Sequence, residues 1–381
     1  LLGAWCVFFI LSNIGVIPAQ AGIQVLEQPL DPGSRSGMTI GMTMALWLGG
    51  VVQGIFALWQ FLSQSVPANK WLGLASHVPQ DLGASVVEFG DERWLRAYGS
   101  FGSPNSLGIY LAVCLVMGVI LYLRFSRCLP LFEGEIKRGC SSSITKHLTL
   151  PSPQGGEGKW KIIISAGQII ITIGLVLSFS RSAWLATVCG LVGLLIVIAR
   201  SGVTKQSFGL EIASSTKSLL AMTVKQLLFI LAPALCLFFI FQPLFLARFN
   251  TDNRLEYKSV SERMGQYQEA KQIFFTHPWL GVGPGAYTLA LSGKYPEAKA
   301  YDLQPVHNIY ALILVEWGMI GFVVFILLNC YIVKLLWRIN KIFIPILAIL
   351  LVAGLFDHWL LTMYTGVSLW WVVWGLGLKK V

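Results

Sequence analysis

The stretch that decides the fold reads IIISAGQIIITIGLVLSF over residues 162–179 and, after Ser180 and Arg181, SAWLATVCGLVGLLIVI over residues 182–198. Each run is apolar almost throughout and close to the ~20 residues that a helix needs to cross ~30 Å of hydrocarbon. The runs are continuous rather than alternating in polarity, and only helices and closed barrels satisfy their backbone polar groups in lipid. They therefore predict two transmembrane helices joined by a very short turn.

Similar runs recur along the whole chain of 381 residues, of which only 12% are charged. The mean hydropathy of +0.68 agrees with this pattern. We predict an all-α integral membrane protein, a multi-helix bundle that forms a single polytopic domain over residues 1–381. We expect about nine transmembrane helices, over residues 1–17, 38–62, 105–125, 162–179, 182–198, 226–246, 306–335, 342–356 and 359–378.

Two segments need a separate interpretation. The chain begins with Leu1, and its first span has no charged flank, so we expect that helices preceding it are missing. A signal peptide is the alternative, but no positive n-region or clear cleavage site is present. Residues 126–160 include a Ser-, Pro- and Gly-rich run, which predicts a disordered cytoplasmic insertion.

The loops divide into two sets by their charge. Lys and Arg gather in residues 126–161, 200–225 and 334–341, and Lys379 and Lys380 close the chain. Because cytoplasmic loops carry an excess of Lys and Arg, we assign this set to the cytoplasm. The net charge of +10 then needs no nucleic acid, and membrane lipids with anionic headgroups are the general partner. The outer side receives residues 63–104, the turn at 180–181, the long loop 247–306 and the turn at 357–358.

The chain offers little for metals or disulfides. None of its seven cysteines falls in an expected outer loop, and no pair has the spacing of metal ligands, so we predict no disulfide and no metal site. Glu88, Asp91 and Glu92 are the alternative for a divalent cation, although carboxylates in a polar loop are usually solvated. No cofactor is expected.

The first candidate site residues lie at two outer helix ends. Arg181 stands where two apolar runs meet on the side where topology gives no reason for a cation. Its planar guanidinium, beside the hydroxyl of Ser180, suits a phosphate or pyrophosphate group. An anchoring arginine is the alternative. Arg96 and Asn105 precede the span that follows, where they face an anion or simply form a loop-to-helix junction.

The long outer loop predicts a surface helix followed by a turn. Ser259-Val-Ser-Glu262 matches a capping box, which places Arg263 in the first turn, and Pro278 ends the helix. Gly283 and Gly285, in the run GVGPG, allow a backbone to approach a ligand closely, although most such runs are only turns. A solvated Arg263 is the alternative to an anion-binding one.

His307, Asn308 and Tyr310 stand at the start of the next span. An imidazole with a pKa near 6.5 suits a general base at neutral pH, and Asn308 can orient it or the substrate. The alternative is a histidine of the polar belt at the membrane surface. Glu316 and Gly318 follow two to three turns further along the helix.

These motifs, in this order, resemble the superfamily of O-antigen ligases and O-antigen polymerases. The pattern runs from Arg96 and Asn105 through SRSA at residues 180–183 and HPWLGVGPG at 277–285 to HNIY at 307–310. The resemblance implies the C-type glycosyltransferase fold of the bacterial inner membrane, with an active site on the periplasmic face. It also implies an undecaprenyl-pyrophosphate-linked glycan as donor, without a nucleotide sugar or a metal.

The resemblance assigns roles residue by residue. Arg181 and Arg263 match the arginines that hold the donor pyrophosphate, and His307 matches the histidine that deprotonates the acceptor hydroxyl. Substrate-binding roles are expected for Arg96, Asn105, Ser180, Gly283, Gly285, Asn308 and Tyr310. The expected reaction is inverting transfer to a glycan or lipid A-core acceptor, in ligation or polymerisation. The alternatives are a protein O-oligosaccharyltransferase and a lipid-linked glycan transporter, which would need charges along several spans and inverted repeats.

Overall fold

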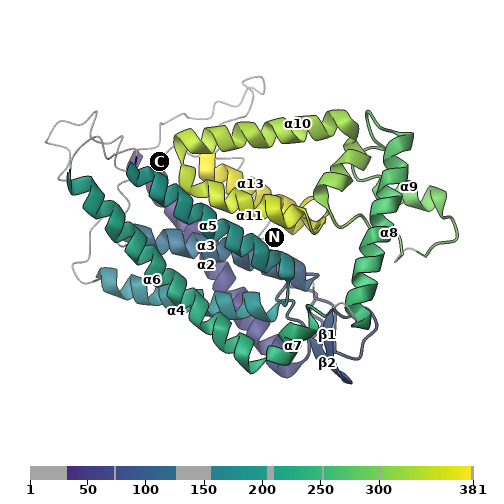
Figure 1. Ribbon diagram of the computed structural model, residues 1–381, viewed down its shortest axis with the longest axis horizontal. Helices are drawn as coiled ribbons and strands as arrows, with labels where there is room; N and C mark the ends of the chain where they lie inside the picture. The colour runs from purple at the N-terminus through teal and green to yellow at the C-terminus, as the bar shows by residue number, and fades with distance from the viewer. Residues whose placement is uncertain are drawn as a thin grey trace.

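The computed structural model describes residues 32–72, 74–125, 156–203, 210–250, 253–299 and 302–378, and it is mostly helical (Figure 1). The expected span 1–17 and most of the expected insertion 126–160 lie outside these residues. Helix α4 already begins at Gly156, so the last residues of that segment are helical. The prediction of an all-α integral membrane protein is confirmed.

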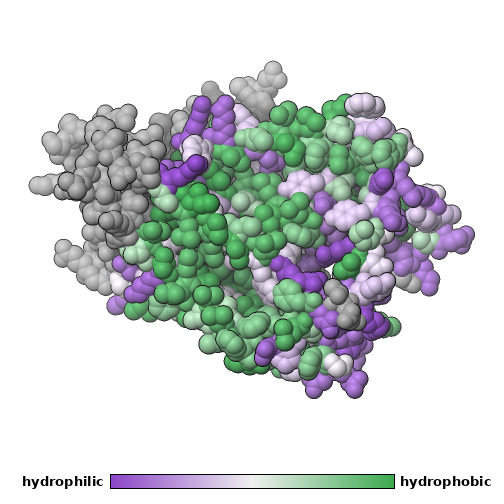
Figure 2. Space-filling view, viewed as in Figure 1, coloured by the Kyte–Doolittle hydropathy of each residue, from purple (hydrophilic) through white to green (hydrophobic). Residues whose placement is uncertain are grey.

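Six helices in the described residues are long and apolar enough to cross a membrane. They are α2 (Pro32–Ser63), α3 (Pro104–Phe125), α4 (Gly156–Leu177), α5 (Arg181–Val203), α6 (Leu210–Ile240) and α10 (Ile309–Ile339). Figure 2 shows apolar surface over the helices and polar residues gathered at the end that carries α8, α9 and the β-hairpin. This pattern is the one a multi-pass membrane protein needs, because its helix flanks meet lipid and its ends meet water.

The last two expected spans differ from the prediction. Residues 342–356 form a 3₁₀ turn, η4 (Lys341–Phe343), followed by α11 (Ile344–Gly354), which is only 11 residues long. Residues 359–378 are split into α12 (Trp359–Thr362) and α13 (Tyr364–Leu378) at Met363, whose backbone is extended. Hydropathy detects an apolar run, but it does not show where the helix within that run is interrupted, as it is here at Met363.

Helix α3 forms the centre of the bundle, with nearly all of its residues buried between α2, α4, α5 and α11. Small residues allow the close packing: a Cβ on Gly174 of α4 would lie 2.8 Å from the Cα of Gly54 in α2. Gln168 is fully buried and donates from Nε2 to the carbonyl of Leu115 at 2.9 Å. A buried amide needs such a partner, and the bond fixes α4 against α3.

One end of the bundle carries the polar structure. The strands β1 (Val86–Phe89) and β2 (Glu92–Leu95) form an antiparallel hairpin there. The following loop is held by the buried Gln60 of α2, whose amide bonds the backbone of Tyr98 and Gly99 at 2.8–3.0 Å. The same loop is tied to α4 by the bond from Ala97 N to Leu177 O at 3.1 Å. Arg96 therefore has a fixed position at this end.

The surface helix α8 (Arg254–Thr276) begins earlier than predicted. Its N-cap is Asn253, whose side chain accepts from Leu255 N at 3.1 Å. The capping-box prediction at Ser259 to Glu262 is therefore wrong, because the upstream Asn253 already caps the first turn. Arg263 consequently lies in the third turn of α8 and not in the first. The predicted end before Pro278 is confirmed.

Helix α10 was predicted as one continuous span, but it is broken at Gly318, where φ is 66° and ψ is −170°. The glycine-rich loop after α8 packs into this break. Val282 N donates to Val315 O at 3.0 Å, and Met319 N donates to Pro278 O at 2.8 Å. Main-chain bonds from a neighbouring segment thus replace part of the helical ladder.

Gly318→Ala tests this packing. A Cβ at Gly318 would lie 2.3 Å from Trp279 O, and the positive φ disfavours any side chain. We expect a loss of at least ~1–3 kcal/mol in the free energy of unfolding, measured by thermal denaturation in detergent. The control is Gly265→Ala in α8, where an added Cβ meets nothing within 4 Å. Equal stability of the two variants would contradict the assigned packing.

Candidate functional site

A cavity of ≈ 750 Å³ opens at the polar end of the bundle, between α3, α5, α8 and the β-hairpin. It is strongly cationic. Two acidic residues line it, Glu256 and Glu262, against seven basic ones: Arg93, Arg96, Arg181, Arg248, Arg254, Lys258 and Arg263. Such an excess of guanidinium groups in one concave site indicates an anionic ligand with several oxygen atoms.

Arg181 is the first residue of α5, where the apolar run ends and its side chain reaches the cavity. Its guanidinium donates from Nη1 to the carbonyl of Arg248 at 2.6 Å and from Nη2 to Oε2 of Glu256 at 2.7 Å. Ser180 is buried behind it, and its hydroxyl lies 3.2 Å from that of Ser182. The predicted cation at this helix start is therefore rigidly oriented.

Arg248 and Glu256 are two site residues that the sequence did not reveal. Arg248 follows the short helix α7 (Gln242–Ala247), and its Nη1 bonds Oε1 of Glu256. Burial lowers the pKa of Arg248 from its usual value, Glu256 opposes this, and the nearby Arg181 adds to the lowering. Burial, together with the charge of Arg248, also lowers the pKa of Arg96. These shifts show cations crowded against one another with few counter-ions.

A chain of polar contacts links this cavity to His307. Arg96 donates from Nε to Ser178 O and from Nη2 to Oδ1 of Asn105, both at 2.9 Å. Asn105 in turn donates from Nδ2 to Oδ2 of Asp357 at 3.2 Å. Oδ1 of Asp357 faces Nδ1 of His307 at 3.6 Å. Arg96, Asn105 and His307, which the sequence analysis singled out, are therefore joined in space through Asp357.

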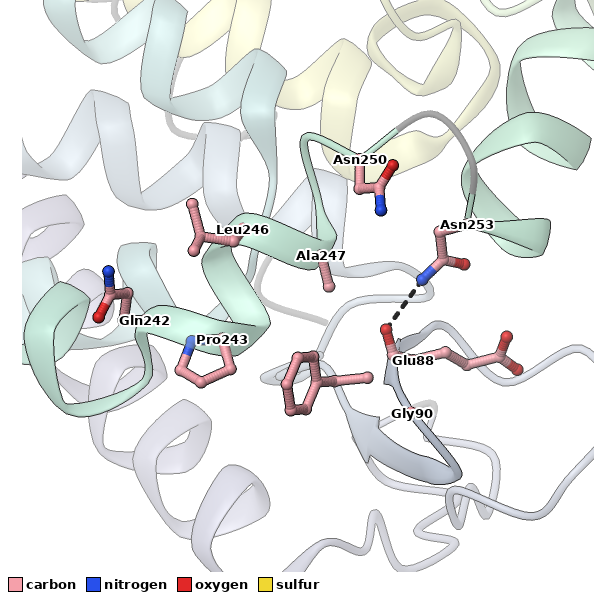
Figure 3. Close-up of a pocket in the computed structure, with 9 residues that line it drawn as sticks. Glu88, Gly90, Gln242, Pro243, Leu246, Ala247, Asn250 and Asn253 are labelled. Carbon is pink, nitrogen blue, oxygen red and sulfur yellow. Dashed lines mark hydrogen bonds between the residues drawn. The ribbon is translucent and has the colours of Figure 1, made fainter.

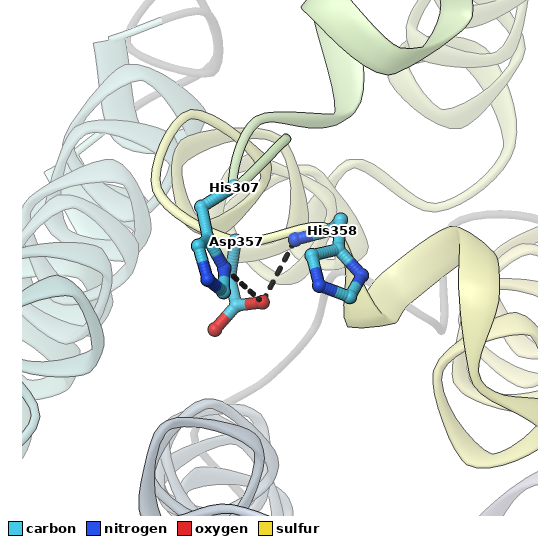
Figure 4. Close-up of side chains that lie close together, drawn as sticks. All are labelled: His307, Asp357 and His358. Carbon is cyan, nitrogen blue, oxygen red and sulfur yellow. Dashed lines mark hydrogen bonds and ion pairs between the residues drawn. The ribbon is translucent and has the colours of Figure 1, made fainter. Parts of the chain in front are cut away.

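The His307–Asp357 pair is shown in Figure 4. At 3.6 Å it is an ion-pair distance longer than a hydrogen bond, and Nδ1 of His307 is buried with no hydrogen-bond partner among the described residues. Burial alone would raise the pKa of Asp357. The nearby His307 ring, the charge of His358 and the Asn105 amide together hold that pKa below its usual value. A carboxylate in this position orients the ring and leaves Nε2 for a substrate proton.

His307, Asp357 and His358 are also the residues that could hold a metal ion, because their ligand atoms lie within 4.8 Å of one another. Their other contacts fit a different arrangement. Nδ1 of His358 lies 2.7 Å from the hydroxyl of Thr362, and its backbone N–H donates to Asp357 at 2.8 Å. Burial lowers the pKa of His358, and the charge of Asp357 opposes this. The sequence prediction of a metal-free site remains a prediction.

The remaining predicted site residues fall into two groups. Arg263 lines the cavity, as expected for an anion ligand. Gly283 and Gly285 instead pack on α10: Gly283 N donates to the carbonyl of Glu316, and Gly285 N donates to its carboxylate, both at 2.9 Å. These two bonds pack the glycine-rich loop against the break in α10. 

Asn308 and Tyr310 fasten the start of α10. Oδ1 of Asn308 caps the helix by accepting from Tyr310 N at 2.8 Å, and its Nδ2 reaches Leu355 O at 3.2 Å. The hydroxyl of Tyr310 donates to Leu351 O in α11 at 2.8 Å. Both residues thus position His307 against the turn that carries Asp357, and neither lines the cationic cavity.

A second, smaller pocket of ≈ 570 Å³ lies beside the cationic cavity (Figure 3). Its polar lining is mainly uncharged, from Gln242, Asn250 and Asn253. Asn253 donates from Nδ2 to Glu88 O at 2.9 Å. The carboxylate of Glu88 contacts Arg93 and Arg254, which line the larger cavity. The two pockets therefore share a wall.

The missed residues differ in how far the sequence could have revealed them. Asp357 and His358 stand between two apolar runs, in the same situation that singled out Arg181, so the same criterion would have selected them. Arg248 and Glu256 lie in the long polar loop among many charges. Only the packing of α7 and α8 against α5 distinguishes them.

The geometry defines a multi-pass membrane protein with a cationic cavity and a pair of a half-buried histidine and a buried aspartate at the same end of its helices. The family model described as O-antigen ligase matches residues 166–326, from α4 to α10. This match, which covers less than half of the chain, supports the O-antigen ligase superfamily and glycan transfer of the ligase and polymerase type. The comparisons with curated proteins and with solved structures found no match. Arg181, Arg263 and His307 lie within the matched segment, and Asp357 lies outside it.

Asp357→Asn distinguishes a His–Asp pair from a metal site. If Asp357 orients His307, the variant should lose ~10²–10⁴-fold in turnover of glycan transfer, the range of general base catalysis. His358→Gln should lose much less, and a chelator should have no effect on the wild type. Comparable losses in both variants together with chelator sensitivity would instead indicate a metal bound by all three residues.

Proposed function

We propose that this protein transfers a glycan from undecaprenyl pyrophosphate to a hydroxyl group of an acceptor sugar, as in O-antigen ligation or polymerisation. The observation that carries the proposal is the chain of contacts from Arg96 through Asn105 and Asp357 to His307. It brings a cavity suited to pyrophosphate and a residue suited to deprotonation to the same end of the bundle.

The donor half of the reaction needs charge stabilisation. Pyrophosphate is a good leaving group once its developing negative charge is neutralised, so it requires cations more than a proton. Arg181 and Arg263 line the cavity from α5 and α8, on two of its sides. Fixed guanidinium groups of this kind gain strength in a partly dry site, because less water screens them.

The acceptor half needs one base. In the proposed step the acceptor oxygen attacks the anomeric carbon, its proton passes to Nε2 of His307, and the bond from that carbon to the phosphate oxygen breaks. Lipid pyrophosphate then leaves with the bonding electron pair. A single displacement inverts the anomeric centre, and no second carboxylate of the hydrolase kind is required.

An enzyme agrees better with the charges than a transporter does. Among the described residues, the buried charged side chains are Arg96, Glu256 and Asp357, and all three lie outside the candidate membrane spans. A transporter that moves a charged glycan lipid through its bundle would need such groups near the middle of the membrane. The charges here instead form one site at the membrane surface.

The assigned roles can be tested by turnover. Purified protein with lipid-linked glycan and an acceptor should release undecaprenyl pyrophosphate. We expect His307→Ala to lose ~10²–10⁴-fold and Arg181→Ala ~10²–10³-fold in kcat. Lys271→Ala removes an exposed cation from α8, the helix that carries Arg263, and should keep full activity. Full turnover in both site variants would contradict the assigned roles. Assays with a sugar acceptor and with a peptide acceptor, run in parallel, distinguish transfer to a glycan from transfer to a protein.

We further propose that the site faces the periplasm of the inner membrane, because the helix ends away from the site carry basic residues, among them Lys161 in α4, Arg200 in α5 and Arg338 in α10. In a cysteine-free background, Glu297→Cys should react with an impermeant maleimide added to intact cells with a permeabilised outer membrane. Arg338→Cys, in the last turn of α10, should react only after lysis. The reverse labelling pattern would overturn the proposed sidedness.

A further inference from the structure

Glu256 has an unusual position for a carboxylate. It lies in the first turn of α8 and is 5% exposed, although the cavity beside it is open to ligand. Both of its oxygen atoms are occupied, Oε2 by Nη2 of Arg181 and Oε1 by Nη1 of Arg248. One carboxylate therefore joins two guanidinium groups from different parts of the chain.

This arrangement has the geometry of anion recognition. Guanidinium groups bind the oxygens of carboxylates and of phosphates with the same donors and at similar distances. The two arginines that hold Glu256 also line the cationic cavity. Moreover, Nε of Arg248 is buried and has no hydrogen-bond partner among the described residues, so this guanidinium has a donor that Glu256 does not use.

The charge balance points the same way. One carboxylate contacts two arginines, while Arg263 stands close enough to Arg248 to lower its pKa, and Arg248 in turn lowers the pKa of Arg96. A pyrophosphate group carries more negative charge and more acceptor oxygens than a carboxylate. It would therefore satisfy this set of cations better than Glu256 does.

We propose that Glu256 occupies the place of the donor pyrophosphate while the site is empty, and that it gives way when the donor binds. Arg248 is then a third pyrophosphate ligand beside Arg181 and Arg263. This inference rests on the proposed function, since it concerns the same donor. Glu256 keeps the arginines in position without a ligand, and by competing for them it limits how tightly the lipid pyrophosphate product is held.

A role in orientation alone makes the opposite prediction. If Glu256 only positions Arg181 and Arg248 and remains between them when the donor binds, its removal should disorder the arginines and weaken pyrophosphate binding. If it competes with the ligand, its removal should strengthen binding. The sign of the change in affinity therefore distinguishes the two roles.

The experiment measures binding of inorganic pyrophosphate to the purified full-length protein by calorimetry. We expect Glu256→Gln to bind about tenfold more tightly than wild type, the effect of losing one charged hydrogen-bond competitor. Glu269→Gln, the same substitution on the same helix outside the cavity, should leave the affinity unchanged.

Thermal denaturation provides the second measurement. Without ligand, Glu256→Gln should unfold at a lower temperature than wild type, because the largely buried Arg248 and the half-buried Arg181 lose their counter-ion. Added pyrophosphate should raise its melting temperature by more than it raises that of wild type, as tighter binding to the folded state requires. Arg248→Gln and Arg181→Gln should both weaken binding of pyrophosphate.

The outcomes separate the two proposals. If wild type binds pyrophosphate and Arg181→Gln weakens it, but Glu256→Gln binds equally or less tightly, the inference about Glu256 is wrong and the donor site stands. If Arg181→Gln binds as wild type does, the donor site itself is wrong. Should Glu256→Gln not fold, Glu256→Asp replaces it: a shorter carboxylate competes less well, and unchanged or weaker binding would again overturn the inference.

Discussion

The structure of the site depends on the amide of Asn105, which contacts Arg96 with its oxygen and Asp357 with its nitrogen. Asn105 belongs to the start of α3, the most buried helix of the bundle. Arg96 comes from the loop after the hairpin, and Asp357 comes from the turn before α12. Because a buried charge without a partner is costly, these segments have to meet at one point. The neutral side chain of Asn105 thus fixes Arg96, which faces the cavity, relative to Asp357, which faces His307.

A second set of contacts positions His307 itself. The residue precedes α10, whose first turns are attached on two sides, to α11 through Asn308 and Tyr310 and to the glycine-rich loop through Glu316. The resemblance implied substrate contacts for several of these residues. The structure gives them main-chain and helix-end contacts that hold the base and the carboxylate together. An active site of this kind needs rigid support as much as it needs reactive groups.

The general fold could be predicted from the sequence because a long, continuous apolar run that crosses a membrane has to form a helix to satisfy its backbone hydrogen bonds. Arg181 could be singled out for a related reason, since a cation between two such runs needs a function or a partner. The break at Gly318 could not be predicted, because the run around it is apolar throughout and the bonds that replace the helical ladder come from residues 278–283. Arg248 and Glu256 were missed for the same physical reason: their roles depend on contacts between α5 and segments 67 and 75 residues away. The start of α8 was misplaced because two capping signals compete there, and the choice of Asn253 rests on its bond to the hairpin residue Glu88.

The break at Gly318 also sets the height of the site above the lipid. As an unbroken helix of 31 residues, α10 would extend about 46 Å, well beyond the hydrocarbon thickness of ~30 Å. Residues 319–339 alone span about 30 Å. The ten residues before them turn back toward α11 at the end of the bundle, as Figure 1 shows. On the proposed function, His307 is therefore presented at the level of the lipid headgroups, and an acceptor has to bring its hydroxyl group down to the membrane surface instead of reacting in the open periplasm.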